Sequence, residues 1–415
     1  MDQEAIVAEE KKESGDSGVT VEPRCEYFGK CGGCRSQHID YSVQVSNKKD
    51  LLARYVGIDA SEIKVFSGDD FNYRNRMDFI VHAKGLGFRK KGQWDKIVDI
   101  DKCDISMLAV NKLLNEVREK FFDPSGIDNF DLHKQRGSFK YVVVRITKSG
   151  DSSLSFVLNS DSSRLAEAVE KVKTYASSNL CSAKNVLITY VDRKRDMSIS
   201  TEYFVVKGSE FLLEELCGHK YYYSIQGFFQ NNPNMAEKMI KYVRSLFVDI
   251  EGGFEAKDVE LLDLYGGVGT FGIALADLFD KVFVVESFAP SIEIAQKNII
   301  ANELSGKVSA YVSEAKQLRN KVPLDILKHS DRSNAKKLFV VCDPPRSGMT
   351  PKAIRRLLEL MPSRIVDISC NPKQLSKEIL KFEAAGYVKK SVAMLDLFPQ
   401  TNHMEGVVEL ILKES

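Results

Sequence analysis

The sequence has no excess of charge of either sign. Its 415 residues carry 59 basic and 58 acidic side chains, which leaves a net charge of +1. A basic field over the whole chain, typical of proteins that coat nucleic acids, is therefore excluded. Any nucleic-acid surface has to be a local basic patch.

Long apolar runs are also missing. No stretch approaches the roughly 18–20 apolar residues of a transmembrane helix, and the N-terminus has no charged-then-apolar signal pattern. We therefore expect a cytoplasmic protein with no membrane partner. Structural disulfides are rare in the cytoplasm, so the eight cysteines need another explanation.

The length and a hydrophobic fraction of 43% predict two or three domains with packed cores. Residues 1–24 are polar and acidic, which indicates a disordered tail. A cysteine-rich segment, 25–44, follows, and 45–225 mixes short helices with alternating strands, as in an α+β central domain. From 226 to 415 strands and helices alternate, which predicts an α/β, doubly wound, mostly parallel Rossmann-like sheet.

A glycine-rich turn in the last region suggests a cofactor site. "LLDLYGGVGTFGIALA" predicts a strand, a turn at Gly266, Gly267 and Gly269, and a helix, and the next strand ends in Glu286. Glycines let a ligand approach the backbone closely, and a carboxylate at that place suits ribose hydroxyls. The alternative is a plain tight turn. No P-loop Gly-Lys-Ser/Thr is present, and we expect S-adenosylmethionine, which has no pyrophosphate to bind, in preference to a dinucleotide.

Two further strands of this sheet end in reactive side chains. "FVVCDPPRSGM" places Asp343 at a strand end, and "RIVDISCNPKQL" places Cys370 at another, just before Asn371 and Pro372. Ligands of such sheets bind beyond the carboxyl ends of the strands, so both residues are candidates for the site. The alternatives are a turn-capping aspartate and a structural cysteine.

Three cysteines near the N-terminus have the spacing C-x5-C-x2-C. They are Cys25, Cys31 and Cys34, and Cys103 is the nearest further thiol. Structural zinc sites usually contain two C-x2-C pairs, whereas three close thiolates and a remote one favour a [4Fe–4S] cluster. By spacing alone, zinc stays open as the alternative.

Taken together, these motifs resemble the S-adenosylmethionine-dependent RNA 5-methyluridine methyltransferases, which act on uracil in tRNA or 23S rRNA. The resemblance runs from Cys25 almost to the C-terminus, through "CEYFGKCGGC", "YRNRMDF", "GFFQNN", "DLYGGVGTF", "VVES", "DPPRSG", "DISCNPKQL" and "DLFPQTNHMEGV" in this order. It departs from the family at Gly266, where relatives commonly carry a cysteine that is not a ligand.

The resemblance implies a role for each motif. It implies that 45–225 binds RNA and that Cys25, Cys31, Cys34 and Cys103 hold a [4Fe–4S] cluster. The implied cofactor-binding residues are Gln230, Tyr265, Gly267, Gly269, Thr270, Glu286 and Asp343. The implied catalytic residues are Cys370 as nucleophile, Glu405 as general base and Asp343 as a hydrogen-bonding partner of the uracil edge.

Covalent catalysis gives a chemical reason for a thiol in such an enzyme. C5 of uracil is a poor nucleophile, and addition of a Cys370 thiolate to C6 would convert the ring into an enolate that is reactive at C5. We expect the site to lower the pKa of Cys370, because only a thiolate attacks. His403 is expected to pack near Glu405 rather than to carry a proton.

The expected partner is an RNA loop, from which a base can flip out cheaply, and no obligate protein partner is evident. Two basic stretches with aromatic residues are candidate RNA contacts or, alternatively, solvated faces: Arg89, Lys90, Lys91 and Trp94, and Lys134, Arg136 and Lys140. The alternative hypotheses for the function are a methyltransferase for a different acceptor and a non-catalytic, cluster-bearing RNA-binding protein. The presence of Cys370, Asp343 and Glu405 argues against both.

Overall fold

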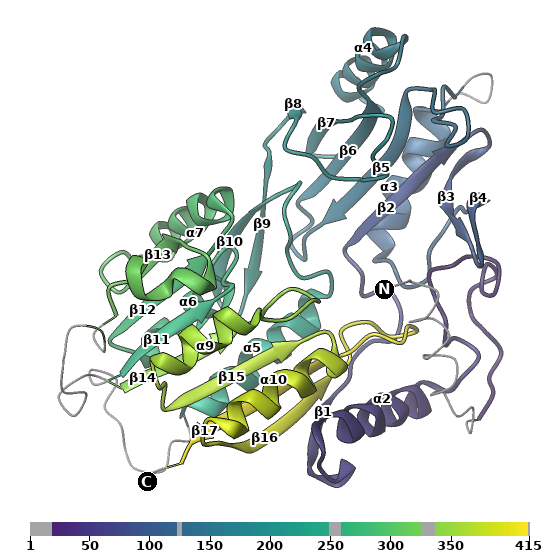
Figure 1. The fold of residues 1–415 in the computed structure, drawn as a ribbon. Helices are drawn as coiled ribbons and strands as arrows, with labels where there is room; N and C mark the ends of the chain where they lie inside the picture. The colour runs from purple at the N-terminus through teal and green to yellow at the C-terminus, as the bar shows by residue number, and fades with distance from the viewer. Residues whose placement is uncertain (1–18, 123–126, 249–258, 325–326, 328–336, 414–415) are drawn as a thin grey trace.

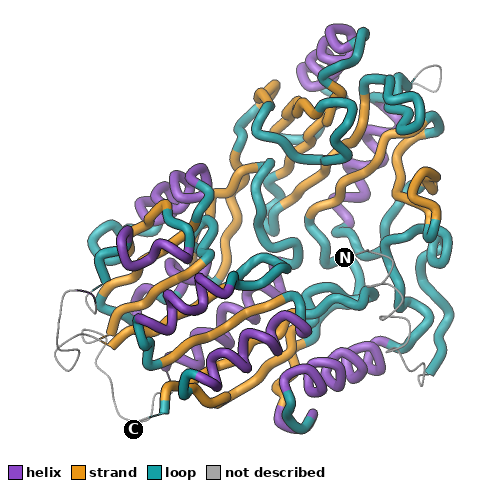
Figure 2. The backbone as a smooth tube through the Cα atoms, viewed as in Figure 1, coloured by secondary structure: helices purple, strands orange, loops and turns teal. Residues whose placement is uncertain are grey.

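The structure is a computed structural model that describes residues 19–122, 127–248, 259–324, 327 and 337–413. Two sheets dominate it, one built mainly from the C-terminal half of the chain and one from the middle (Figure 1). Loops occupy much of the region between the two sheets (Figure 2).

The larger sheet has eight strands. Their order is β1 (Ile63–Phe66), β16 (Tyr387–Leu395), β17 (Glu405–Leu412), β15 (Arg364–Ser369), β14 (Lys337–Cys342), β11 (Val259–Leu264), β12 (Lys281–Glu286) and β13 (Val308–Val312). β17 is antiparallel to β15 and β16, and every other neighbouring pair is parallel. The predicted mostly parallel, Rossmann-like sheet is therefore confirmed, and β17 is a strand that the sequence reading missed.

Helices cover both faces of this sheet. On one face lie α5 (Pro233–Val248), α6 (Thr270–Ala274) and α7 (Ala289–Ala301), and on the other lie α2 (Tyr41–Val56), α9 (Pro351–Glu359) and α10 (Pro372–Ala384). Alternate residues of one strand serve the two cores, as with Leu261 and Leu262 of β11. Burial on both faces explains why the parallel strands read as continuous apolar runs.

The second sheet has seven strands. They are β4 (Gln93–Asp99), β3 (Gly85–Lys90), β2 (Arg76–His82), β5 (Phe139–Ile146), β6 (Ser152–Asn159), β7 (Asn185–Val191) and β8 (Tyr203–Lys207), in this order. Helices α3 (Leu108–Lys120) and α4 (Leu165–Ser177) pack on one face. A ribbon of β9 (Phe211–Leu216) and β10 (His219–Ser224) follows in the chain before α5.

The chain does not divide between the sheets as the sequence suggested. Although β1 and α2 lie within the expected central domain 45–225, β1 pairs with β16 and α2 packs in the core of the larger sheet. Most of the expected tail, 1–24, is outside the described residues, but Val21 N donates to His38 O at 3.0 Å and Asp40 N to Val19 O at 3.0 Å. The last residues of that segment are thus hydrogen-bonded rather than disordered.

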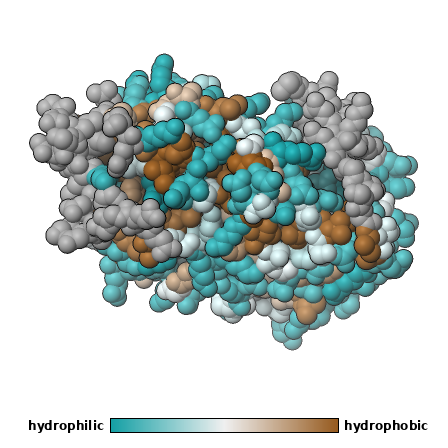
Figure 3. Space-filling view, turned by 90° about the horizontal axis from the view of Figure 1, so that it is seen from below, coloured by the Kyte–Doolittle hydropathy of each residue, from teal (hydrophilic) through white to brown (hydrophobic). Residues whose placement is uncertain are grey.

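Within the described residues, none of the helices is both long and apolar enough to cross a membrane. On the face drawn in Figure 3, apolar residues form separate patches among polar ones rather than one continuous band.

Candidate active site

Cys370 lies at the junction between a strand and a helix. β15 ends at Ser369, and α10 begins at Pro372. The Asn371 side chain caps the helix by accepting from Gln374 N at 3.3 Å, and Pro372 suits the first helical turn because it needs no backbone donor. The Asn-Pro turn therefore starts a helix directly after the thiol and holds Cys370 at the helix N-terminus.

Glu405 and Asp343 flank this junction. Asp343 follows β14, the neighbour of β15, and Glu405 is the first residue of β17, whose Gly406 pairs with Ser369. Because β17 runs antiparallel to β15, its start lies at the edge where β14 and β15 end. The sequence reading placed Glu405 beyond the last strands of the sheet. The structure corrects this, because Glu405 begins a strand inserted inside the sheet.

The pKa values of all three groups are raised. Burial raises the pKa of Asp343 to about 7, and burial followed by Asp343 raises the pKa of Glu405 well above its usual value. Burial, then Glu405 and Asp343, raises the pKa of Cys370 to about 11, with Arg346 opposing them. The expectation that the site itself lowers the pKa of Cys370 is therefore wrong for this structure, since one cation faces two carboxyl groups and a partly buried thiol.

Glu405 is a buried carboxyl group at the same edge of the sheet. It is only 8% exposed, and its Oε2 atom is buried without a hydrogen-bond partner among the described residues. Buried polar atoms are usually paired, so an unpaired carboxylate oxygen at a strand edge indicates a ligand-facing group.

The segment that leads to Glu405 is fixed by the N-terminal third of the chain. Lys48 Nζ of α2 contacts Asp396 Oδ1 at 2.7 Å and Phe398 O at 3.2 Å, and both partners of this ion pair are buried. The amide of Gln44 also bonds the Gln400 side chain at 2.9 Å. This explains why α2 packs with the larger sheet: it anchors the loop between β16 and β17.

The glycine turn forms a pocket at the ends of β11 and β12. Tyr265, Gly267 and Gly269 have φ angles of 62°, 54° and 87°, so the chain makes a tight left-handed turn before α6 begins at Thr270. A cavity of about 160 Å³ is lined by Tyr265 and Glu286, together with Ser313 and other residues of the same edge. Gly267, Gly269 and Thr270 belong to the adjoining turn.

Asp263 is a residue of this turn that the sequence reading missed. It is buried, and its Oδ2 accepts from Gly272 N of α6 at 2.7 Å. A Cβ at Gly266 would lie 2.7 Å from Val284 Cγ1 and 3.0 Å from Asp263 Oδ2, so a side chain there would need the turn to shift. The signal available in the sequence was an acidic residue at the end of an otherwise apolar strand.

Gln230 lies in the segment between β10 and α5 and is half-buried. Two residues on, Asn232 Nδ2 donates to Leu397 O at 3.1 Å, which ties this segment to the loop before Glu405. Phe228 is 76% exposed and, like His403, lines the cavity that also contains the four N-terminal cysteines. An exposed phenylalanine at a cavity is a second feature that sequence reading did not single out.

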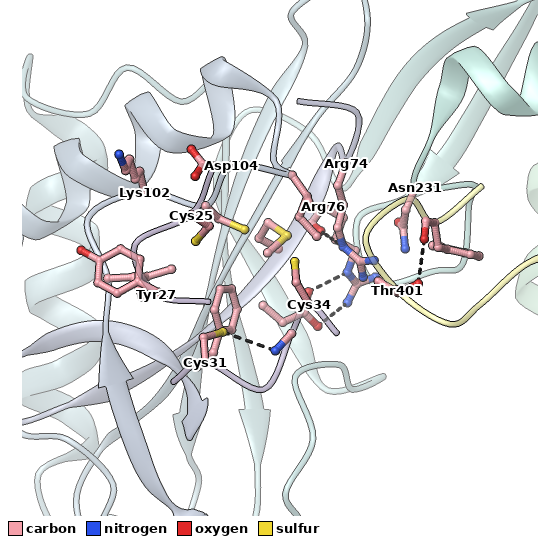
Figure 4. A pocket seen from close by; sticks show the side chains of 18 of the residues that line it. Cys25, Tyr27, Cys31, Cys34, Arg74, Arg76, Lys102, Asp104, Asn231 and Thr401 are labelled. Carbon is pink, nitrogen blue, oxygen red and sulfur yellow. Dashed lines mark hydrogen bonds and ion pairs between the residues drawn. The ribbon is translucent and has the colours of Figure 1, made fainter. Parts of the chain in front are cut away.

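Cys25, Cys31, Cys34 and Cys103 line one cavity of about 670 Å³. Figure 4 shows the thiols of Cys25, Cys31 and Cys34 in this space, beside Tyr27 and Asp104. The sequence therefore predicted correctly that Cys103 lies with the other three. None of the eight cysteines forms a disulfide.

The cavity offers four thiols as donors. Within the described chain, no group of three or more His, Cys, Asp or Glu side chains has the close arrangement that one metal ion needs. A cubane cluster separates its four thiolates more widely than one ion does, and the lining includes the apolar residues Phe28, Ile100 and Ile105. The donor set and its surroundings thus fit a [4Fe–4S] cluster.

Two other predictions from the sequence concern His403 and Lys140. Desolvation, followed by Arg346, Lys48, Arg35 and Arg74, lowers the pKa of His403 to about 4, so the ring is neutral near pH 7, but the residue is exposed rather than packed in a core. Lys140, a predicted RNA contact, is instead buried and bonds Asp192 O at 2.8 Å and Arg195 O, because it closes a turn of the smaller sheet.

A Rossmann-like sheet with a glycine turn, an acidic residue at the end of the next strand, and Asp343, Cys370 and Glu405 at one edge indicates the class of S-adenosylmethionine-dependent methyltransferases. Residues 40–413 match the family model "tRNA (Uracil-5-)-methyltransferase". The chain belongs to this family, and it is an S-adenosylmethionine-dependent RNA (uracil-C5) methyltransferase.

Similar proteins agree with this assignment. A tRNA (uracil(54)-C(5))-methyltransferase of Pyrococcus horikoshii is 34% identical over 411 residues, covering 98% of this chain and 90% of that protein. An uncharacterized RNA methyltransferase of Caldanaerobacter subterraneus is 31% identical and covers 94% of this chain and 84% of its own length. The Pyrococcus abyssi tRNA (uracil-54, C5)-methyltransferase, solved with S-adenosyl-L-homocysteine, has a TM-score of 0.73 at 28% identity and covers 92% of this chain and 86% of its own.

Proposed function

We propose that the protein methylates C5 of a uridine in the T-loop of tRNA, corresponding to position 54, through a covalent adduct on Cys370. The observation that carries this proposal is the meeting of Cys370, Asp343 and Glu405 at one edge of the sheet, with the buried Oε2 of Glu405 unpaired. The tRNA substrate is supported by the relatives named for uracil 54, and 23S rRNA is the alternative substrate.

The roles follow from the chemistry of the ring. The Cys370 thiolate forms a bond to C6, and the C5–C6 electron pair moves into an enolate. S-adenosylmethionine supplies the electrophilic methyl group at its sulfonium. When C5 has gained the methyl, Glu405 takes the C5 proton and the S–C6 bond breaks to return the thiolate. The raised pKa of Glu405 makes it a stronger base than an ordinary carboxylate.

Asp343 and Phe228 would hold the base in place. Asp343, with a pKa raised by burial to about 7, can donate or accept a hydrogen bond at the uracil edge and stabilise the enolate. Phe228 offers an exposed ring on which the flipped base can stack. Glu286, Tyr265, Gly267, Gly269, Thr270 and Gln230 would hold the cofactor, with Glu286 bonding the ribose.

The experiment compares two variants that fail at different steps. Cys370→Ala should form no adduct and transfer no methyl group, because C6 is never attacked. Glu405→Gln should add and methylate but retain the C5 proton, and thus trap a methylated protein–RNA adduct that survives denaturing electrophoresis. Cys217→Ser, which alters a half-buried thiol outside the site, is the matched control and should turn over normally.

Mapping 5-methyluridine in tRNA and in 23S rRNA treated with the enzyme identifies the substrate. Label at tRNA position 54 supports the proposal, whereas label only in 23S rRNA contradicts the substrate. Normal turnover of Cys370→Ala would contradict the covalent route.

We also propose that Cys25, Cys31, Cys34 and Cys103 hold a [4Fe–4S] cluster with a structural role. The cluster, when bound, supplies four metal–thiolate links between the N-terminal loop and the segment before α3. Asn111 fixes the Cys103 backbone through bonds of 2.9 and 3.0 Å, so the ligand loop is already shaped. Protein purified without oxygen should contain four irons and four sulfides, and Cys31→Ser should lower thermal stability more than it alters chemistry. Stoichiometric zinc without labile sulfide would contradict this assignment.

A further inference from the structure

An exposed aromatic and basic surface lies on the smaller sheet, away from Cys370. It consists of Lys90, Lys91, Trp94 and Lys96 on the β3–β4 hairpin and His133, Lys134 and Arg136 on the loop before β5, and we call it the Trp94 surface. Trp94 is 65% exposed, and its ring centroid is 6.0 Å from that of His133. A large exposed indole beside a second ring forms a platform on which a nucleobase can stack.

The cations of the Trp94 surface are available to a ligand. The side chains of Lys90, Lys91, Lys96 and Arg136 are exposed and form no ion pair with any residue in the described part of the chain. The acidic groups nearby include Asp95, whose carboxylate lies 3.5 Å from His133 Nε2, and Asp131, which lies 3.5 Å from Lys134 Nζ. Asp196 is also near, and it pairs with Arg89. Positive charge therefore exceeds negative charge here, although the whole chain is nearly neutral.

Contacts within and around the β3–β4 hairpin fix the shape of the Trp94 surface. The Arg89 side chain is not one of the available cations, because it donates to Trp94 O and to Asp196. A Cβ at Gly87 would lie 1.9 Å from Val98 O, so β3 and β4 approach closely. Trp94 is thus presented by a braced hairpin, which reduces the conformational entropy lost when a ligand binds.

The cysteine-rich loop connects this hairpin to the catalytic loop. Gly32 N donates to Arg89 O at 2.9 Å, and three residues later Arg35 N donates to Gln400 O at 2.9 Å. Three residue steps span at most about 11 Å. The segment between β16 and β17 accordingly lies on the same side of the molecule as the hairpin (Figure 1).

We propose that the Trp94 surface is a second RNA-binding site, which holds a part of the substrate outside the target loop. The Trp94 ring stacks on an unpaired base, and Lys90, Lys91, Lys96 and Arg136 contact phosphates. The inference rests on the proposed RNA substrate and adds a docking site remote from the methylated uridine. Excess positive charge around an exposed ring favours RNA over a protein partner.

Trp94 itself gives the first test, because it is the only tryptophan in the sequence. Titration of the complete protein with full-length tRNA should quench and shift its fluorescence, since stacking on a base changes the surroundings of the indole. A hairpin RNA with only the target loop should bind with a smaller change. Unchanged emission at saturating tRNA would overturn the proposal.

Variants give the second test. Trp94→Ala should weaken binding of full-length tRNA by about 5- to 100-fold, and Trp94→Phe should restore part of it, because both rings stack. Lys90→Glu with Lys96→Glu should lower the slope of log affinity against log salt by roughly 0.7–0.9 for each lost phosphate contact. Lys281→Glu is the control for a charge reversal elsewhere on the chain, because Lys281 begins β12 at the sheet edge opposite the site.

Turnover on the short hairpin separates the two proposals. Trp94→Ala should methylate it as fast as the unaltered enzyme does, while its kcat/KM on full-length tRNA falls. If the enzyme methylates tRNA but the Trp94 and lysine variants bind it normally, the second site is wrong and the proposed function stands. Capture of a protein partner by the surface, with tRNA binding unaffected, would also overturn the inference.

Discussion

At the scale of single residues, the site gathers three acidic groups with little positive charge beside them in the described part of the chain. Cys370, Asp343 and Glu405 all have raised pKa values, and Arg346 opposes this only for the thiol. A cationic ligand would favour the ionised forms of these groups. The sulfonium of S-adenosylmethionine carries such a positive charge, whereas the sulfur of S-adenosylhomocysteine is neutral.

We therefore expect proton release when S-adenosylmethionine binds near pH 7. The sulfonium should lower the raised pKa values of Asp343 and Glu405, so protons held by the ligand-free site leave. Affinity for S-adenosylmethionine should then rise as the pH increases towards the ligand-free pKa of Asp343, about 7, and level off above it. Calorimetry in buffers with different ionisation enthalpies measures the protons released.

S-adenosylhomocysteine is the control ligand for this prediction. It makes the same adenosine contacts without the charge, so it should release fewer protons and show a flatter pH dependence. Glu405→Gln should also reduce the number released. Equal proton release by both ligands in the unaltered enzyme would contradict the electrostatic account.

At the scale of elements, the loop after β14 is locked to α10. Glu378 of α10 is buried, and its Oε1 accepts from Met349 N at 2.7 Å and from Gln374 Nε2 at 3.0 Å. Gly348 lies next to this contact and has a φ of 72°. Because Asp343 precedes the loop and Cys370 precedes α10, these contacts help to fix the distance between the two proposed catalytic groups.

Gly348→Ala should break this lock. The new Cβ would lie 2.1 Å from Glu378 Oε1, and the left-handed backbone disfavours alanine by about 1–2 kcal/mol. We expect kcat to fall by about tenfold to a hundredfold, because small displacements of reacting groups are costly. Gly306→Ala, with no other heavy atom within 4 Å and no positive φ, is the control and should leave kcat unchanged. Equal kcat values for both variants would contradict the role of the loop.

At the scale of the whole molecule, a buried arginine joins the smaller sheet to the segment between β10 and α5. Arg145 of β5 is fully buried and donates to Gly227 O and Phe229 O, each at 2.9 Å, while its guanidinium lies 4.4 Å from the centroid of the Tyr223 ring. Burial lowers its pKa to about 10, which still leaves it charged at neutral pH. The smaller sheet thereby positions the segment that carries Gln230.

Arg145→Ala should therefore affect both stability and cofactor binding. Removing two charged donors from buried carbonyls should cost about 2–4 kcal/mol of unfolding free energy. Affinity for S-adenosylmethionine should fall as well, because Gln230 follows directly. Denaturant titration and calorimetry measure the two effects, and Arg164→Ala, at a 60% exposed side chain, should change neither. Loss of stability with unaltered cofactor affinity would separate the smaller sheet from the cofactor site.

The sequence by itself determined the local features of this protein. Apolar runs, caps and turn residues predicted β11, β12, β14, β15 and the helices between them, since these signals depend on neighbours in the chain. The reactive groups at strand ends, Asp343 and Cys370, were found in the same way. Together with the family motifs, this was enough to predict the larger sheet and its enzyme class.

Only the tertiary structure decided how distant segments combine. The pairing of β1 with β16 and the burial of Lys140 depend on contacts across more than 50 residues. The insertion of β17, with Glu405 at its start, depends on its pairing with both β15 and β16. The raised pKa of Cys370 likewise arises from carboxyl groups on other strands. Burial and electrostatic fields are sums over neighbours in space, and the order of residues along the chain does not specify which neighbours those are.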